Sequence, residues 1–109
     1  MLTERRSAKR VVCDLQSSFR DFDSVTSWSS SFASVKDISR GGMKLRTHAP
    51  IHLNDRLGIS FNLPINHKTI EVKATPVWIS EIPNTGIYDV GVRFLEVFPE
   101  DKTVIENFC

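Results

Sequence analysis

Apolar and polar residues alternate along the first part of the chain. From Val11 to Phe19 the odd positions are mostly apolar, whereas Asp14, Gln16 and Ser18 occupy even positions. A repeat of two residues is typical of a β-strand with one buried face. This stretch therefore predicts a first strand.

Five further strands are predicted after a serine-rich segment, DSVTSWSSSFAS (23–34), which indicates a long turn. The second strand is expected near Phe32 to Ile38, where the alternation is blurred. Turn residues in HAPIHLND, LPINHK and IPNTG separate the later runs. The apolar positions of these runs are Met43 and Leu45; Leu57, Ile59, Phe61 and Leu63; Ile70, Val72 and Ala74, continuing to Val77 and Ile79; and Val90, Val92 and Phe94.

The apolar phase changes at Pro76 in the fifth run. Apolar positions are even up to Ala74 and odd at Val77 and Ile79. A β-bulge at the proline would return both halves of this strand to the core. We therefore expect Val77 and Ile79 to point inward.

The last segment, PEDKTVIENFC (99–109), predicts a short helix that plugs one end of the fold. It opens with proline and two acids, as helix N-termini favour, and Val104, Ile105 and Phe108 fall on one helical face. Because no helix lies between the strands, the pattern indicates an antiparallel barrel or sandwich. We expect one domain over residues 11–109.

Length and composition describe an ordinary globular protein. The 109 residues are 40% hydrophobic and 25% charged, which excludes a disordered or fibrous chain. No apolar run approaches the roughly 18 residues of a membrane span, and MLTERRSAKR lacks the apolar segment of a secretory signal. A cytoplasmic location is expected.

Metal and cofactor chemistry has little support in the sequence. Cys13 and Cys109 lie at opposite ends of the chain, so both are expected to be free thiols. His48 and His52 flank a proline, which favours a loop over the helix that would bring both to one ion. We expect no metal site and no cofactor.

Catalysis is also not expected. Ser39 and Cys13 are possible nucleophiles, but neither lies in a nucleophile elbow. Trp78, within VWI, is expected in the core or the barrel wall rather than in a stacking site. Trp28, in the serine-rich turn, is expected to be either an exposed contact or a loop anchor.

Charge is concentrated at the N-terminus. Residues 1–10, here called the N-terminal arm, carry Arg5, Arg6, Lys9 and Arg10 against Glu4, although the whole chain has a net charge of +1. A short basic arm suits a small anionic ligand better than a long nucleic acid, so no DNA or RNA partner is expected. A solvated tail is the alternative.

Two short motifs, RRSAKR and DISRGG, carry chemistry that suits a guanine nucleotide. The guanidinium groups of Arg6 and Arg10 match phosphate oxygens and the acceptor edge of guanine. Asp37 and Ser39 would share a strand face, where the carboxylate accepts hydrogen bonds from the guanine N–H groups. Gly42 would leave room for a ring on the backbone.

The order of these motifs resembles that of PilZ domains, which are receptors for cyclic di-GMP. Arg6 and Arg10 fall on the family's R-x-x-x-R, Asp37, Ser39 and Gly42 fall on its D/N-x-S-x-x-G, and DVGVRFLEV is similar to its final strand. The resemblance covers essentially the whole chain. It implies a six-stranded antiparallel β-barrel, a bacterial source and no enzymatic activity.

The resulting hypothesis is a cyclic di-GMP receptor that signals to a protein partner, with an output such as motility or biofilm formation. The arm would be flexible and would close over the ligand, and Arg5 would allow two stacked ligand molecules per chain. Alternatives are a PilZ-like interaction module without ligand, a barrel that binds single-stranded nucleic acid, and an Asp37 that only caps a glycine turn. The expected ligand-binding residues are Arg5, Arg6, Arg10, Asp37, Ser39, Gly41 and Gly42.

Overall fold

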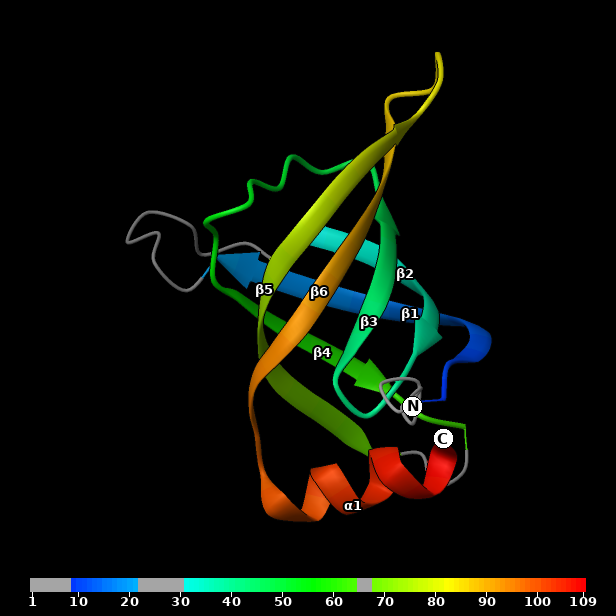
Figure 1. Cartoon of the computed structure of the whole chain (residues 1–109), viewed down its shortest axis with the longest axis vertical. Coiled ribbons are helices and arrows are strands. Elements are labelled where there is room, and N and C mark those ends of the chain that lie inside the picture. The colour runs from blue at the N-terminus through cyan, green and yellow to red at the C-terminus, as the bar shows by residue number, and fades with distance from the viewer. Residues whose placement is uncertain (1–8, 22–30, 65–67) are drawn as a thin grey trace, which may run out of the picture.

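The computed structural model describes residues 9–21, 31–64 and 68–109 of the chain. Six strands and one helix follow one another in these residues (Figure 1). Their bounds are β1 Val11–Asp21, β2 Ser31–Ile38, β3 Gly42–Thr47, β4 Leu57–Asn62, β5 Thr69–Ile82, β6 Ile87–Val97 and α1 Pro99–Phe108.

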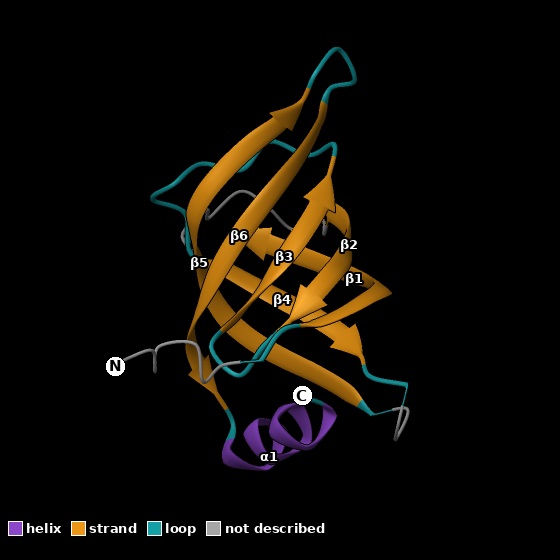
Figure 2. Ribbon diagram, turned by 45° about the vertical axis from the view of Figure 1, so that its right-hand side comes forward, coloured by secondary structure: helices purple, strands orange, loops and turns teal. Residues whose placement is uncertain are grey.

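The strands form a closed barrel in the order β1-β2-β3-β6-β5-β4, with every neighbouring pair antiparallel. The barrel closes where the second half of β1, Ser17–Asp21, pairs with Leu57–Phe61 of β4. Figure 2 shows α1 across one end of the barrel and the turn between β5 and β6 projecting at the other end. The predicted six-stranded antiparallel barrel with a C-terminal helix is confirmed.

The core fills the inside of the barrel with the apolar residues that alternation predicted. Polar residues of the same strands face outward, so the period of two carries through most of the sheet. At Ser17 the inward position of β1 is polar, and its buried hydroxyl donates to the carbonyl of Ala33 at 2.9 Å. The largest fully buried side chains are Val35, Ile38, Leu45, Leu57, Ile59, Leu63, Ile70, Val90 and Ile105.

The predicted bulge in β5 is present, but the residues on either side of it differ from expectation. Pro76 pairs with Val92 and Trp78 pairs with Gly91, so Val77 is the extra residue. As the unpaired residue, Val77 faces outward and is 51% exposed, so the prediction that it points inward was wrong. Pro76 is buried instead.

Trp78 also lies on the outer surface of the barrel, with 39% of its area exposed. Of the two places predicted for it, the core and the barrel wall, the structure gives the barrel wall. Ile79, one residue further along, is half-buried against the core as expected.

Helix α1 begins at Pro99 and places Glu100 and Asp101 in its first turn, where acids interact favourably with the helix dipole. Ile105 is buried in the core, and the carboxylate of the buried Asp101 lies 3.2 Å from the Lys68 ammonium. These contacts confirm the predicted helical plug. In the described part of the chain, no helix is long and apolar enough to cross a membrane.

Candidate functional site

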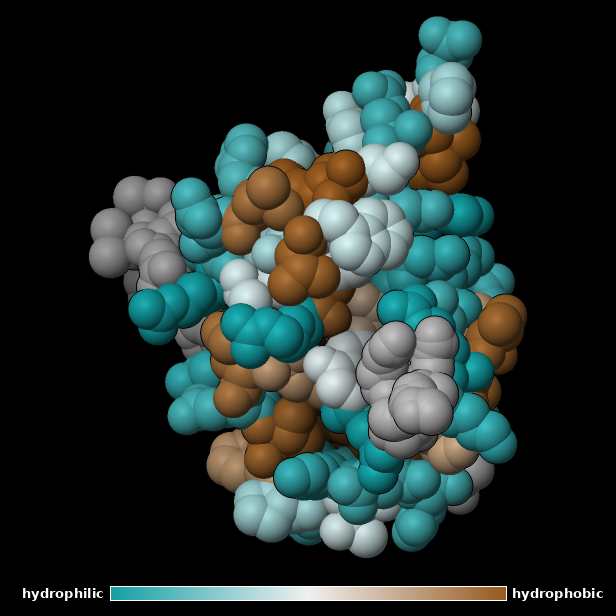
Figure 3. Space-filling view, viewed as in Figure 1, coloured by the Kyte–Doolittle hydropathy of each residue, from teal (hydrophilic) through white to brown (hydrophobic). Residues whose placement is uncertain are grey.

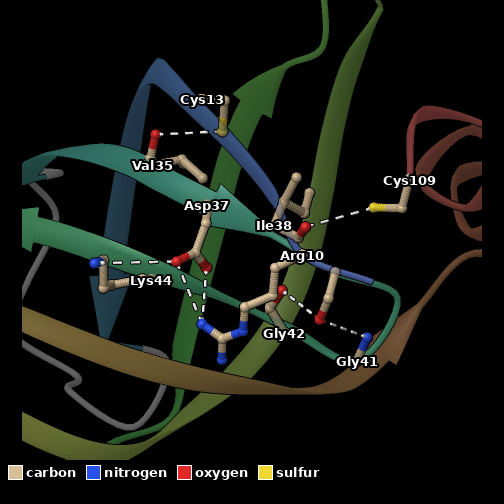
Figure 4. Close-up of polar contacts among 10 residues, drawn as sticks. Arg10, Cys13, Val35, Asp37, Ile38, Gly41, Gly42, Lys44 and Cys109 are labelled. Atoms are coloured by element: carbon tan, nitrogen blue, oxygen red, sulfur yellow. Dashed lines mark hydrogen bonds and ion pairs between the residues drawn. The ribbon is translucent and has the colours of Figure 1, made fainter. Parts of the chain in front are cut away.

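Asp37 lies one residue before the end of β2 and is the centre of a polar cluster on the outer face. Its carboxylate accepts hydrogen bonds from Nη1 of Arg10 at 3.2 and 3.3 Å, and Nζ of Lys44 lies 4.0 Å from Oδ2. In Figure 4 the two cations reach the carboxylate from different sides. Asp37 is only 8% exposed, although it faces outward.

A bulge in β2 aims Asp37 outward. Val35 pairs with Leu45 and Asp37 pairs with Lys44, so Lys36 is the extra residue between them. Val35 and Ile38 are both fully buried, a spacing of three that simple alternation cannot give. The bulge therefore lets Asp37 face outward although its neighbours on both sides of the bulge fill the core.

Arg10 reaches Asp37 because of the pairing between β1 and β2. Val12 of β1 lies opposite Asp37. Arg10 comes two positions earlier, just before the start of β1, and its side chain therefore lies beside the carboxylate. Of the two arginines in the R-x-x-x-R motif, the structure places this one at the site. Arg5 and Arg6 lie outside the described residues.

We expected Ser39 to share a strand face with Asp37. This expectation was wrong, because β2 ends at Ile38 and Ser39 lies in the turn that follows. Its N–H donates to the Gly42 carbonyl at 2.8 Å, and its hydroxyl donates to the same carbonyl at 3.4 Å. The hydroxyl also accepts from the N–H of Gly41 at 3.3 Å. The serine therefore fixes the shape of the turn that follows the carboxylate.

The two glycines of the turn have different structural roles. A Cβ on Gly42 would lie 2.1 Å from the carbonyl oxygen of Val92, so this glycine makes room for the backbone of β6. Its role in binding a ligand ring stays a prediction. A Cβ on Gly41 would meet no atom within 4 Å. Gly41, whose carbonyl accepts from the N–H of Phe94 at 2.9 Å, is thus the open backbone position of the turn.

Strand pairing places a row of residues from four strands side by side on the outer face of the barrel. Asp37 of β2 lies opposite Lys44 of β3, Lys44 lies opposite Gly91 of β6, and Gly91 lies opposite Trp78 of β5. A Cβ on Gly91 would lie 2.1 Å from Nε1 of Trp78, so the indole lies directly against this glycine. We call Asp37, Lys44, Gly91 and Trp78 the outer row.

Lys44 is the outer-row residue that sequence reasoning missed, although a signal for it exists. Met43 and Leu45 are inward positions of the third strand, so alternation alone places Lys44 outside, directly after the glycine motif. The apolar neighbours of Trp78 pointed to the core, and the bulge that turns it outward was predicted in the wrong register.

Other charged residues around the row are paired with each other. Arg46 donates to both carboxylate oxygens of Asp89, at 2.7 and 3.1 Å. These hydrogen bonds hold the pKa of Asp89 below its usual value and raise that of Arg46. Lys36 donates to Asp14 at 3.0 Å. These pairs border the site without closing it.

The two thiols both contact the backbone of β2 and are free, as expected. Cys13 donates to the carbonyl of Val35 at 3.6 Å, and Cys109, after the end of α1, donates to the carbonyl of Ile38 at 3.5 Å (Figure 4). Burial raises the pKa of both thiols, and the nearby Asp37 carboxylate raises that of Cys13 further. Neither thiol is activated as a nucleophile.

The remaining candidates are two histidines and one tryptophan. His48 and His52 line a cleft of about 370 Å³ together with Tyr88. No group of three or more potential metal ligands occurs in the residues that the structure describes. Trp28 lies outside the described residues.

The barrel, its helical plug and the polar turn after β2 define a small antiparallel β-barrel domain. The family model for the PilZ domain matches residues 4–109, so the chain belongs to the PilZ family, a cyclic di-GMP receptor family. A search of curated proteins finds no match.

Solved structures agree with this assignment of the fold. The Bacillus subtilis inhibitor of motility MotI/DgrA matches with a TM-score of 0.81 and 17% identity, over 98% of this chain and 50% of that one. Escherichia coli YcgR in complex with c-di-GMP matches with a TM-score of 0.74 and 21% identity, over 96% and 44%. This chain therefore spans about half the length of both proteins.

The PilZ domain of E. coli YcgR with c-di-GMP, taken by itself, matches with a TM-score of 0.68 and 18% identity. That match covers 96% of this chain and 88% of the YcgR domain. The described barrel and helix thus correspond in extent to one PilZ domain.

Proposed function

We propose that this chain is a bacterial cyclic di-GMP receptor of the cytoplasm, which binds the dinucleotide between the N-terminal arm and the outer face at Asp37–Gly42. Bound ligand would alter the conformation of the arm, and a protein partner would recognise the altered surface. The output would be a process such as motility or biofilm formation. The observation that carries the proposal is the contact of Arg10 with Asp37, which brings the two halves of the site together.

Each group has a defined role in this proposal. The Asp37 carboxylate accepts hydrogen bonds from the Watson–Crick edge of a guanine, and Arg10 donates to the ligand from the opposite side. The open backbone at Gly41 lets the ligand approach the turn. The Trp78 indole, which lies against Gly91 and is 39% exposed, offers an aromatic surface at the other end of the outer row.

The rest of the arm would complete the site. Arg6 would supply the second cation of R-x-x-x-R, and Arg5 would bind the face of a second, stacked ligand molecule. Amide exchange in residues 1–10 is expected to slow when cyclic di-GMP binds. Unchanged exchange would refute the conformational switch, and a calorimetric stoichiometry near one would refute the second ligand.

The experiment that tests the function is a calorimetric titration of the purified chain with cyclic di-GMP and, separately, with single-stranded oligonucleotides at two salt concentrations. Saturable binding of the dinucleotide alone is expected, and Arg10→Ala and Asp37→Asn should each weaken it at least tenfold. The matched control is Arg20→Ala, which removes a cation from the opposite end of β1 and should leave binding unchanged.

Two other outcomes would overturn the proposal. Salt-sensitive binding of the oligonucleotides without dinucleotide binding would indicate a nucleic-acid barrel. Binding of neither, by a folded protein, would indicate an interaction module that does not use this ligand.

A further inference from the structure

We propose that Lys44 is a further ligand-binding residue, the cation that contacts a phosphodiester group of the bound dinucleotide. This inference rests on the proposed function and extends it to a residue outside both sequence motifs. It follows from the position of Lys44 in the outer row and from the way its ammonium group is bonded.

The Lys44 ammonium differs from two neighbouring cations on this face, Arg46 and Lys36. Arg46 makes two hydrogen bonds to Asp89, and Lys36 makes one to Asp14 at 3.0 Å. Nζ of Lys44 lies 4.0 Å from Oδ2 of Asp37, which is an ion pair without a hydrogen bond. Within the described residues, the donors of Lys44 are therefore available to another acceptor.

The position of Lys44 fits the dimensions of the ligand. Neighbouring strands lie about 4.8 Å apart, so Asp37 and Gly91 flank Lys44 at about that spacing on β2 and β6. A dinucleotide with a guanine at Asp37 and its other end toward Trp78 must cross β3. Its charged backbone would then pass over Lys44.

The surrounding charges favour exchange of a carboxylate for a phosphate. Lys44 faces two acids, Asp37 and Asp89, but Asp89 is already bonded to Arg46. When a guanine engages the oxygens of Asp37, a phosphodiester oxygen can replace that carboxylate as the partner of Lys44. The lysine side chain is 29% exposed, so part of it is open to a ligand.

The test compares Lys44→Met with Lys36→Met, which removes the neighbouring cation that is already hydrogen-bonded. We expect Lys44→Met to weaken cyclic di-GMP binding about tenfold in calorimetry, as loss of one charged hydrogen bond does. The affinity of Lys44→Met should also fall less with added salt than that of the wild type. Lys44→Arg should stay within about threefold of the wild type, and Lys36→Met within about twofold.

A second measurement uses the unaltered protein and so does not depend on whether a variant folds. Lysine acetylation followed by mass spectrometry should show Lys44 protected by saturating cyclic di-GMP, with Lys36 modified at the same rate as without ligand. Equal protection of the two lysines, or an affinity of folded Lys44→Met within twofold of the wild type, would overturn the inference.

The outcomes also separate this inference from the function on which it rests. If Arg10→Ala and Asp37→Asn lose binding while Lys44→Met keeps it, the receptor function stands and the role of Lys44 falls. If the wild type does not bind cyclic di-GMP, the receptor function itself is wrong.

Discussion

Nη1 of Arg10 lies 3.2 Å from Oδ1 of Asp37 and thereby joins two residues that are 27 positions apart in the chain. The Arg10 side chain is 60% exposed, and ion pairs with so much access to water contribute about 1 kcal/mol or less to stability. The pair is therefore better suited to positioning the arm than to stabilising the barrel.

The first prediction separates these two roles. Arg10→Ala should lower the free energy of unfolding by about 1 kcal/mol or less, because the barrel core is untouched. Urea denaturation of Arg10→Ala, Asp37→Asn and the double variant measures this and the coupling between the residues. A loss of several kcal/mol would contradict a positioning role.

The second prediction contrasts the two adjacent glycines of the turn. Gly42→Ala should destabilise the fold by about 3 kcal/mol, because its Cβ would collide with the backbone carbonyl of Val92. Gly41→Ala, whose Cβ meets no atom within 4 Å, should change stability by about 0.5 kcal/mol at most. Thermal and urea unfolding compare the pair directly.

Ligand affinity adds a second test to the same pair. If the dinucleotide lies over the open backbone, Gly41→Ala weakens its binding while the melting temperature stays that of the wild type. Unchanged affinity of Gly41→Ala would place the ligand elsewhere on the face.

The third prediction concerns the indole that lies against Gly91. Gly91→Ala should push Trp78 off the sheet, because the added Cβ would lie 2.1 Å from its Nε1. In a Trp28→Phe background the emission should shift to the red as the ring becomes more exposed to water. The parent background with Gly91 intact is the control, and identical spectra would show that the indole does not rest on this glycine.

The fourth prediction is a dependence of stability on pH. Hydrogen bonds from Arg46 lower the pKa of Asp89 in the folded state, so its contribution to stability is complete above the unfolded value of about 4. That contribution is lost as the pH falls through the folded pKa. Asp89→Asn should therefore be less stable than the wild type at pH 7, by about 1 kcal/mol, and the difference should shrink as the pH falls.

A matched control for this pH effect is Glu96→Gln. Oε1 of Glu96 lies 3.1 Å from Nζ of Lys73, but the Glu96 side chain is 72% exposed. Its replacement should therefore change the free energy of unfolding little at any pH. Denaturation at pH 7 and pH 2 gives both comparisons. A stability difference for Asp89→Asn that is as large at pH 2 as at pH 7 would contradict the ion-pair explanation.

The period-two pattern predicted most of the fold because a closed barrel with one filled interior imposes it on every strand. Where a bulge adds a residue, the pattern loses its phase. This explains both the blurred alternation before Ile38 and the wrong orientation of Val77. A bulge can be suspected from such a shift, but its register depends on pairing with strands far away in the sequence.

The candidate site was predictable where it depends on residue type and less so where it depends on packing. Arg10 and Asp37 were identified from motif chemistry, and the structure brings them together. The packing role of Gly42 was not predicted because the carbonyl that needs its missing side chain belongs to β6, fifty positions away. Lys44 was missed because its importance arises from three strand pairings and not from any local motif.

A single peptide bond joins Asp37, which would recognise the nucleotide, to Ile38, which is fully buried. Changes in recognition made at this carboxylate therefore risk disturbing interior packing. The side chains at positions 44 and 78 are more open to solvent than Asp37 is, with Lys44 29% exposed and Trp78 39% exposed. Engineering a variant with a different nucleotide preference should begin at those two positions.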